Sequence, residues 1–188
     1  LVSFSTPALG RKLFAEKNYP QDHKWNQLDF RNGDLNTSII KTQLGRTIMV
    51  QWDETSPRPY SRLNLVQGTM GILAGFPTRI ALEGGVEGIT KDHHRWVEGE
   101  DLEKVYEKYD HPLYKRLNQQ SKNSGHGGMD GIMMFRIVEC LQKGLPIDQN
   151  VYEGAFWSAV TELSGKSIQQ DGAPQQFPDF TRGNWKNT

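Results

Sequence analysis

The sequence predicts an α+β fold in which an open, mostly antiparallel sheet is covered by helices on one face. Short β-branched or alternating runs fill the first half of the chain. Long segments with apolar residues at helical spacing fill the second half. Because 188 residues are enough for one domain with a core, we expect residues 1–188 to form a single domain.

The strand-like segments are separated by short connections. Such connections favour antiparallel pairing, because a parallel crossover needs about a dozen residues or more. The Leu1–Ser5 segment also has the pattern of a strand. The other expected strands are Thr37–Thr42, Arg46–Trp52, Leu63–Gly68, Met70–Pro77 and Arg79–Leu82. Together they predict an open sheet with one face that needs a cover.

Two helical segments supply that cover. Met129–Lys143 has apolar residues at helical spacing, and Gly144 with Pro146 ends the pattern. Val151–Ile168 repeats the same periodicity. Asp148 precedes this segment and is its expected N-cap.

The remaining segments are less regular. Leu102–Asn118 is predicted to be helical in pieces, because Pro112 interrupts it. Gly84–Glu100 is expected to be a surface excursion. The tail from Gln170 carries prolines and aromatic residues, which indicates an extended arm packed on the domain. Cys140 falls on a helical position that is expected to be buried. Because it is the only cysteine in the sequence, neither an internal disulfide nor a thiolate metal cluster can form.

Composition argues against several partners. Lys and Arg total 22, as do Asp and Glu, so nothing indicates electrostatic capture of nucleic acid. The longest apolar runs are too short for a membrane span. His93 and His94 point apart in a strand and share no helical face, so we predict no metal site there. No dinucleotide-binding fingerprint, phosphate-binding loop or nucleophile elbow is present, so no cofactor-binding residue is predicted in this chain.

The Thr55–Arg62 segment is the first candidate ligand site. Pro57 and Pro59 hold the residues before them out of the helical region, so Arg58 and Tyr60 are displayed from a stiff connection. A stiff loop loses little entropy when a ligand binds. A guanidinium and a phenol are groups that a sugar or a small anion would meet. The alternative is an ordered turn with solvated arginines.

The Gly125–Asp130 segment is the second candidate. Its glycines permit close approach of the backbone to a ligand, and His126 lies near the start of a predicted helix, which suits a polar or anionic group. The alternative is that the glycines and Asp130 simply begin the helix. Carboxylates for ordinary glycoside cleavage cannot be selected from the scattered Asp and Glu residues, so the catalytic residues are unknown.

Three collinear motifs resemble the C-terminal domain of the NAD-dependent α-N-acetylgalactosaminidases, glycoside hydrolase family 109. They are Gly45–Gln51 running into Ser56–Arg62, then Gly125–Asp130, then Phe177–Gly183. Their order and spacing fit along nearly the whole chain. That family belongs to the Gfo/Idh/MocA-type oxidoreductase folds, so the resemblance implies a C-terminal α+β domain that closes over the substrate. It also implies an N-terminal Rossmann domain that binds NAD, which we expect upstream of Leu1.

The resemblance further implies an activity for the complete enzyme on a glycoside substrate, the release of terminal α-linked N-acetylgalactosamine. The sugar would be oxidised at C3 with hydride going to NAD, and the glycosidic bond would then break by elimination of the leaving group. Water would add to the sugar, and the hydride would return to C3. Tyr60 is the one substrate-binding residue that carries over from the family. Arg58 and His126 are added as substrate-binding candidates from local chemistry alone. Trp52 stands where the family usually has histidine.

Two alternatives stay open. One is an NAD(P)-dependent sugar or inositol dehydrogenase of the same fold. The other is a non-catalytic binding or oligomerisation domain that forms a homo-oligomer through the open sheet. We expect the chain alone to be inactive, because the NAD site and the main acid and base groups would lie upstream. The resemblance favours a bacterial periplasmic or secreted protein and leaves a cytoplasmic one open.

Overall fold

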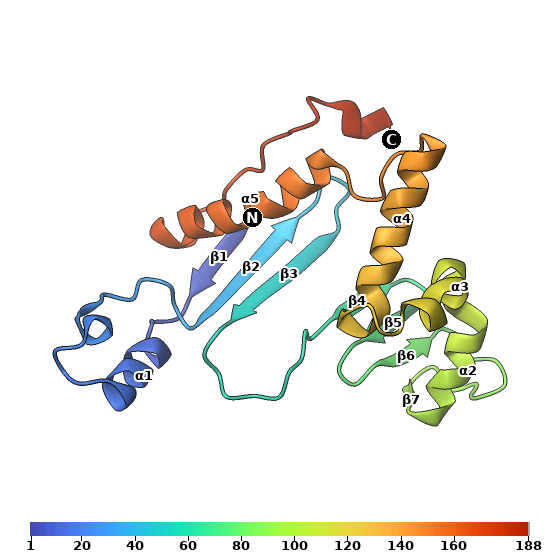
Figure 1. The fold of residues 1–188 in the computed structure, drawn as a ribbon, viewed down its shortest axis with the longest axis horizontal. Coiled ribbons are helices and arrows are strands. Elements are labelled where there is room, and N and C mark those ends of the chain that lie inside the picture. The colour runs from blue at the N-terminus through green and yellow to red at the C-terminus, as the bar shows by residue number, and fades with distance from the viewer. Residues whose placement is uncertain (188) are drawn as a thin grey trace. The chain divides into compact units, whose positions relative to one another are not determined.

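The computed structural model describes residues 1–187 and has an α+β fold (Figure 1). The chain divides into two compact units. Unit 1 consists of Leu1–Arg58 together with the chain from Gln149 onward, and unit 2 consists of Pro59–Asp148. Each unit has its own antiparallel sheet and its own helices. The predicted fold class is therefore confirmed, although the strands form two sheets rather than one continuous meander.

Unit 1 contains a three-stranded antiparallel sheet in the order β1–β2–β3. Helix α1 and the short 3-10 helix η1 lie in the connection between β1 and β2, and α5 and η3 follow much later in the chain. The bounds are β1 Val2–Ser5, α1 Gly10–Asn18, η1 Lys24–Gln27, β2 Leu35–Lys41, β3 Thr47–Asp53, α5 Val151–Gln169 and η3 Asn184–Asn187.

Helix α5 packs over β1 on one face of this sheet through a cluster of buried serines, and it leaves Ile48 and Val50 of β3 exposed on the same face. The Ser3 N–H donates to Ser167 Oγ at 2.9 Å, and the hydroxyls of Ser3 and Ser38 lie 2.8 Å apart. Ser3 and Ser167 are fully buried. These small side chains let α5 lie close to β1, while Ile40 and Leu163 supply buried apolar surface nearby in the unit.

The other face of the sheet is open. The register places Val2, Ile39 and Met49 side by side on it, away from the serine cluster. Ile39 is 49% exposed and Met49 is 71% exposed. The expected arrangement, a sheet covered by helix on one face, is therefore present in unit 1.

Unit 2 contains a four-stranded antiparallel sheet in the order β4–β5–β6–β7. Helices α2, α3 and α4 follow it in the chain, and the short 3-10 helix η2 leads directly into α4. The bounds are β4 Leu65–Gly68, β5 Gly71–Ala74, β6 Arg79–Leu82, β7 Val97–Glu98, α2 Glu100–Tyr109, α3 Pro112–Ser121, η2 His126–Gly128 and α4 Met129–Lys143.

The Gly84–Glu100 stretch contributes to the core of unit 2, so its description as a surface excursion was wrong. Val86 and Val97 are buried, and they pack with Leu102 and Val105 of α2. Val97 also pairs with β6. Two isolated valines among glycines and charged residues carry no periodicity, and for that reason the sequence pattern did not reveal their burial.

The long helices match their predictions closely. Helix α4 spans the predicted residues, and Gly144 ends it in the left-handed region with φ +64°. Helix α5 begins at Val151 as predicted, but its N-cap is Asn150 rather than Asp148. The Asn150 side chain accepts the N–H of Glu153, whose carboxylate accepts the N–H of Asn150 in return, which is a capping box. Asp148 is instead bonded to Arg136.

The weaker predictions also hold. Two helices, α2 and α3, occupy the region interrupted at Pro112, and Cys140 is buried. The tail packs on unit 1, because Gln175 exchanges backbone hydrogen bonds with Leu1 and the Phe177 ring stacks on Phe156. Within residues 1–187, each helix is too short or too polar to cross a bilayer.

Replacing Ser167 by alanine is expected to lower the free energy of unfolding by about 1–3 kcal/mol, because the buried Ser3 N–H loses its acceptor. Ser158 is exposed on the same helix, so Ser158→Ala is a matched control with an expected change within about 0.5 kcal/mol. Urea denaturation measures both. Equal losses in the two variants would contradict a special role for the buried serine.

Candidate functional site

The carboxylate of Asp53, at the end of β3, organises the beginning of the Thr55–Arg62 segment. It accepts the N–H groups of Thr55 and Ser56 at 3.3 and 3.1 Å, and it accepts Arg58 Nε–H at 3.1 Å. The Ser56 N–H, helped by Arg58, holds the pKa of Asp53 below its ordinary value. The Asp53 carboxylate therefore stiffens the start of the segment, in addition to the prolines. The sequence analysis did not predict this role of Asp53. An Asp three residues before a Ser-Pro pair was the available signal.

Tyr60 is displayed as predicted, with 69% of its surface exposed. Its hydroxyl oxygen accepts Arg62 Nε–H at 2.7 Å. Its ring meets the edge of Phe76 with centroids 5.5 Å apart. Both ends of the side chain are therefore held in place, and the phenolic O–H keeps its proton for donation to a ligand.

His126 lies in a left-handed turn immediately before α4. Its φ is +44°, and Gly125, Gly127 and Gly128 around it also have positive φ. Its Nδ1 lies 3.0 and 2.9 Å from the two carboxylate oxygens of Asp130. Asp130 therefore orients an exposed imidazole as well as occupying the first turn of the helix. A non-glycine residue in this region is strained, which makes the position a candidate functional one.

The three predicted residues belong to separate local arrangements. Arg58 is in unit 1, whereas Tyr60 and His126 are in unit 2. Tyr60 contacts Arg62 and Phe76, and His126 contacts Asp130. A joint role for the three in sugar binding stays a prediction.

Unit 1 contains a hollow of about 870 Å³ with aromatic walls. Phe14, Trp25, Phe30 and Trp52 line it. Trp52 is 61% exposed. The charged groups at its edge are the ion pair of Arg11 with Glu54, and Asp53, which binds Arg58. Trp52, which stands where the family pattern has histidine, thus places an exposed ring on a wall of this hollow.

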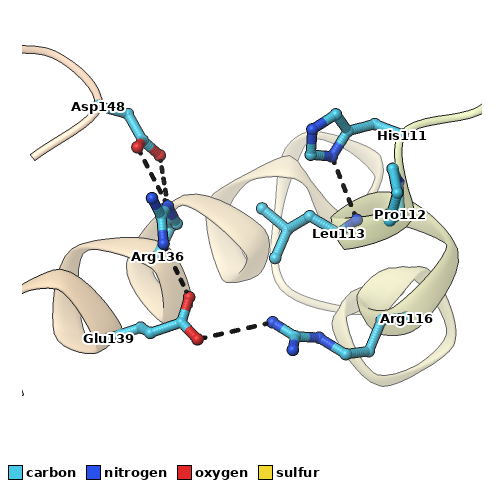
Figure 2. Close-up of a pocket in the computed structure, with 7 residues that line it drawn as sticks. All are labelled: His111, Pro112, Leu113, Arg116, Arg136, Glu139 and Asp148. Carbon is cyan, nitrogen blue, oxygen red and sulfur yellow. Dashed lines mark hydrogen bonds and ion pairs between the residues drawn. The ribbon is translucent and has the colours of Figure 1, made fainter. Parts of the chain in front are cut away.

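Unit 2 contains a hollow of about 520 Å³ beside α3 and α4 (Figure 2). Five of its seven lining residues have charged or polar side chains. The walls are formed by His111, Pro112, Leu113, Arg116, Arg136, Glu139 and Asp148. Within the part of the chain that the structure describes, there is no group of three or more His, Cys, Asp or Glu side chains that could hold a metal ion.

Comparison with known proteins identifies the family. Residues 1–187 match the family model described as glycosyl hydrolase 109, C-terminal domain. The chain belongs to this family. Among similar proteins are glycosyl hydrolase family 109 proteins 1 and 2 of Akkermansia muciniphila, 65% and 59% identical over the whole chain, and a family 109 protein 1 of Shewanella sp. strain MR-4, 54% identical over the whole chain.

The family 109 domain spans only part of each of these relatives. It covers 39% of the first Akkermansia protein and 40% of the other two relatives. The names of the relatives place the chain in a glycosyl hydrolase family, which agrees with the predicted resemblance. The activity of a whole protein that contains this domain is taken up below as a proposal.

We expect Asp53→Asn to destabilise unit 1 most at neutral pH. The lowered pKa means that the folded state favours the carboxylate, so this stabilisation is present above the unfolded-state pKa and is lost as the pH falls through the lower folded-state pKa. The difference in melting temperature between wild type and Asp53→Asn should therefore shrink below about pH 4. Asp22→Asn, at an exposed position of unit 1, is the control and should show no such convergence. A pH-independent Asp53→Asn effect would refute the ionic role.

Proposed function

We propose that this domain forms the substrate-binding side of an NAD-dependent glycosidase that removes terminal α-linked N-acetylgalactosamine. The observation that carries the proposal is the family 109 match over residues 1–187. The exposed and doubly anchored Tyr60 supports it, because that residue carries over from the family pattern.

NAD does not fit the residues of this chain. The sheets of residues 1–187 are antiparallel, whereas dinucleotides bind at the carboxyl ends of parallel strands beside a glycine-rich turn. We therefore place NAD on a domain outside these 188 residues and assign none of its contacts here. NAD, when bound there, would supply reversible hydride transfer at the sugar.

The role of the chain's own residues is to hold the sugar. The Tyr60 hydroxyl would donate a hydrogen bond to a sugar oxygen, with Arg62 and Phe76 fixing its direction. In unit 1, Arg58, anchored on Asp53, is a candidate donor to a sugar oxygen. The exposed Trp52 ring of the same unit has an apolar face of the kind that packs on a pyranose.

Tyr60→Phe, introduced into the full-length protein, is expected to lower kcat/KM for an aryl α-N-acetylgalactosaminide about fivefold to tenfold, because one hydrogen bond to the sugar is lost. Tyr109 is a comparably exposed tyrosine of unit 2, so Tyr109→Phe is the control and should leave kcat/KM unchanged. Release of the aryl alcohol in the presence of NAD measures both.

Each alternative has its own result in this assay. Failure of the wild-type full-length protein to release sugar would refute the glycosidase proposal. Net production of NADH from a free sugar would indicate a dehydrogenase. We expect the 188-residue chain alone to release no sugar, and turnover by that chain would refute the assignment of NAD to another domain.

His126→Gly separates a functional from a structural role for this strained histidine. Glycine adopts φ +44° readily, so relief of strain should offset the lost contact with Asp130, and the melting temperature should change little. If His126 contacts the sugar, kcat/KM should nevertheless fall about tenfold. His93→Ala, in an exposed turn, is the control. Unchanged kcat/KM in His126→Gly would remove His126 from the site.

The open sheet face of unit 1 supports a second role, the formation of a homo-oligomer. Exposed apolar side chains such as Ile39 and Met49 lie together on that face. Light scattering over a range of concentrations tests this role. A monomeric mass at all concentrations for the full-length protein would exclude it, and a Met49→Lys variant should shift a dimer toward monomer.

A further inference from the structure

The hollow beside α3 and α4 in unit 2 has the chemistry of an anion site (Figure 2). We propose that it binds a small monoanionic carboxylate. None of the three predicted sugar-binding residues lines it. The proposal is therefore independent of the glycosidase assignment.

Both carboxylates in this hollow accept hydrogen bonds from cations of the chain. Both oxygens of Asp148 accept Arg136 Nε–H, at 2.8 and 3.1 Å. Glu139 accepts Lys143 Nζ–H at 2.7 Å and Arg136 Nη1–H at 2.9 Å. The bond from Lys143, followed by that from Arg136, holds the pKa of Glu139 below its ordinary value. Both carboxylates are thus committed to cations of the chain itself.

The donors are not all occupied. Arg116 Nη2 lies 3.9 Å from Glu139 Oε1, which is beyond hydrogen-bond distance. Its guanidinium stacks over the Phe135 ring, 5.1 Å from the ring centroid, and its side chain is 55% exposed. A guanidinium held by its face keeps its edge N–H groups for a ligand. Arg136 uses Nε and Nη1 in its bonds within the described chain, so Nη2 is a further donor.

His111 contributes a third donor through its position at the start of α3. Its Nδ1 accepts the Leu113 N–H at 3.1 Å, as the N-cap of the helix. A ring nitrogen that accepts carries no proton, so in the neutral imidazole the proton is on Nε2. Figure 2 shows the His111 ring on one wall of the hollow and Arg136 with Asp148 on the other.

Charge and shape indicate the class of ligand. Among the lining residues, the charges of Arg116 and Arg136 balance those of Glu139 and Asp148. Lys143, which lies outside the lining, also binds Glu139, so the cluster that includes it carries one positive charge when His111 is neutral. A carboxylate supplies one negative charge and two coplanar oxygens, which match the edge of a guanidinium. A hollow of about 520 Å³ has the size of a small-molecule site.

Titration of the purified 188-residue chain with sodium acetate, at constant ionic strength balanced by sodium chloride, tests the site by two-dimensional NMR. We expect saturable shifts of the Leu113 amide and the Arg116 Nε–H. Arg116→Gln should weaken acetate binding about tenfold. Arg46→Gln, in the exposed turn between β2 and β3, removes the same charge elsewhere and should bind as wild type does.

A second variant tests His111 without removing the helix cap. Asparagine is a strong N-cap residue, so His111→Asn should preserve α3 while the Nε2–H donor is lost, and acetate binding should weaken several-fold. The proposal is overturned if acetate produces no saturable shift, or if Arg116→Gln and His111→Asn both fold and bind as wild type does. Equal or tighter binding of sulfate would overturn the carboxylate class. Equal or tighter binding of glucose would overturn the requirement for an anion.

Discussion

The buried hydrogen bond from the Ser3 N–H to Ser167 Oγ is the contact on which unit 1 depends most directly. It joins the first strand to a helix 164 residues later in the chain, and both serines are fully buried. The ladder pairs of β1, β2 and β3 set the register of the sheet, and α5 packs on β1. Asp53 then marks the end of β3 and the beginning of the Thr55–Arg62 segment.

Three of the candidate ligand-binding side chains share a physical arrangement. A carboxylate lies beside each of them and restricts its orientation. Asp53 binds Arg58, Asp130 binds His126, and Glu139 with Asp148 binds Arg136. The pair of His126 with Asp130 is exposed and adds little to stability by itself, whereas the side chains of Asp53 and Glu139 are only 12% and 15% exposed. The effect of each pair is to restrict the orientations of a guanidinium or an imidazole before a ligand arrives, which lowers the entropy lost on binding.

Regular patterns were predictable and local exceptions were not. Apolar periodicity with a terminal glycine located α4 residue by residue. The same reasoning chose Asp148 as the cap of α5, but Asn150 is closer to the helix and completes a capping box with Glu153. Val86 and Val97 were missed because their burial depends on α2, which lies later in the chain. Within the candidate site, the display of Tyr60 was predicted, whereas its contacts with Arg62 and Phe76 were not.

The sequence by itself determined the α+β class, the long helices, the stiff proline segment and the family resemblance, because these depend on local propensity and on the order of motifs along the chain. Only the tertiary structure decided that the strands form two sheets and that Asp148 binds Arg136. It also decided that His111, Arg116 and Arg136 line one hollow. Side chains on different helices meet through packing, and no periodicity within either helix encodes which of them will face one another.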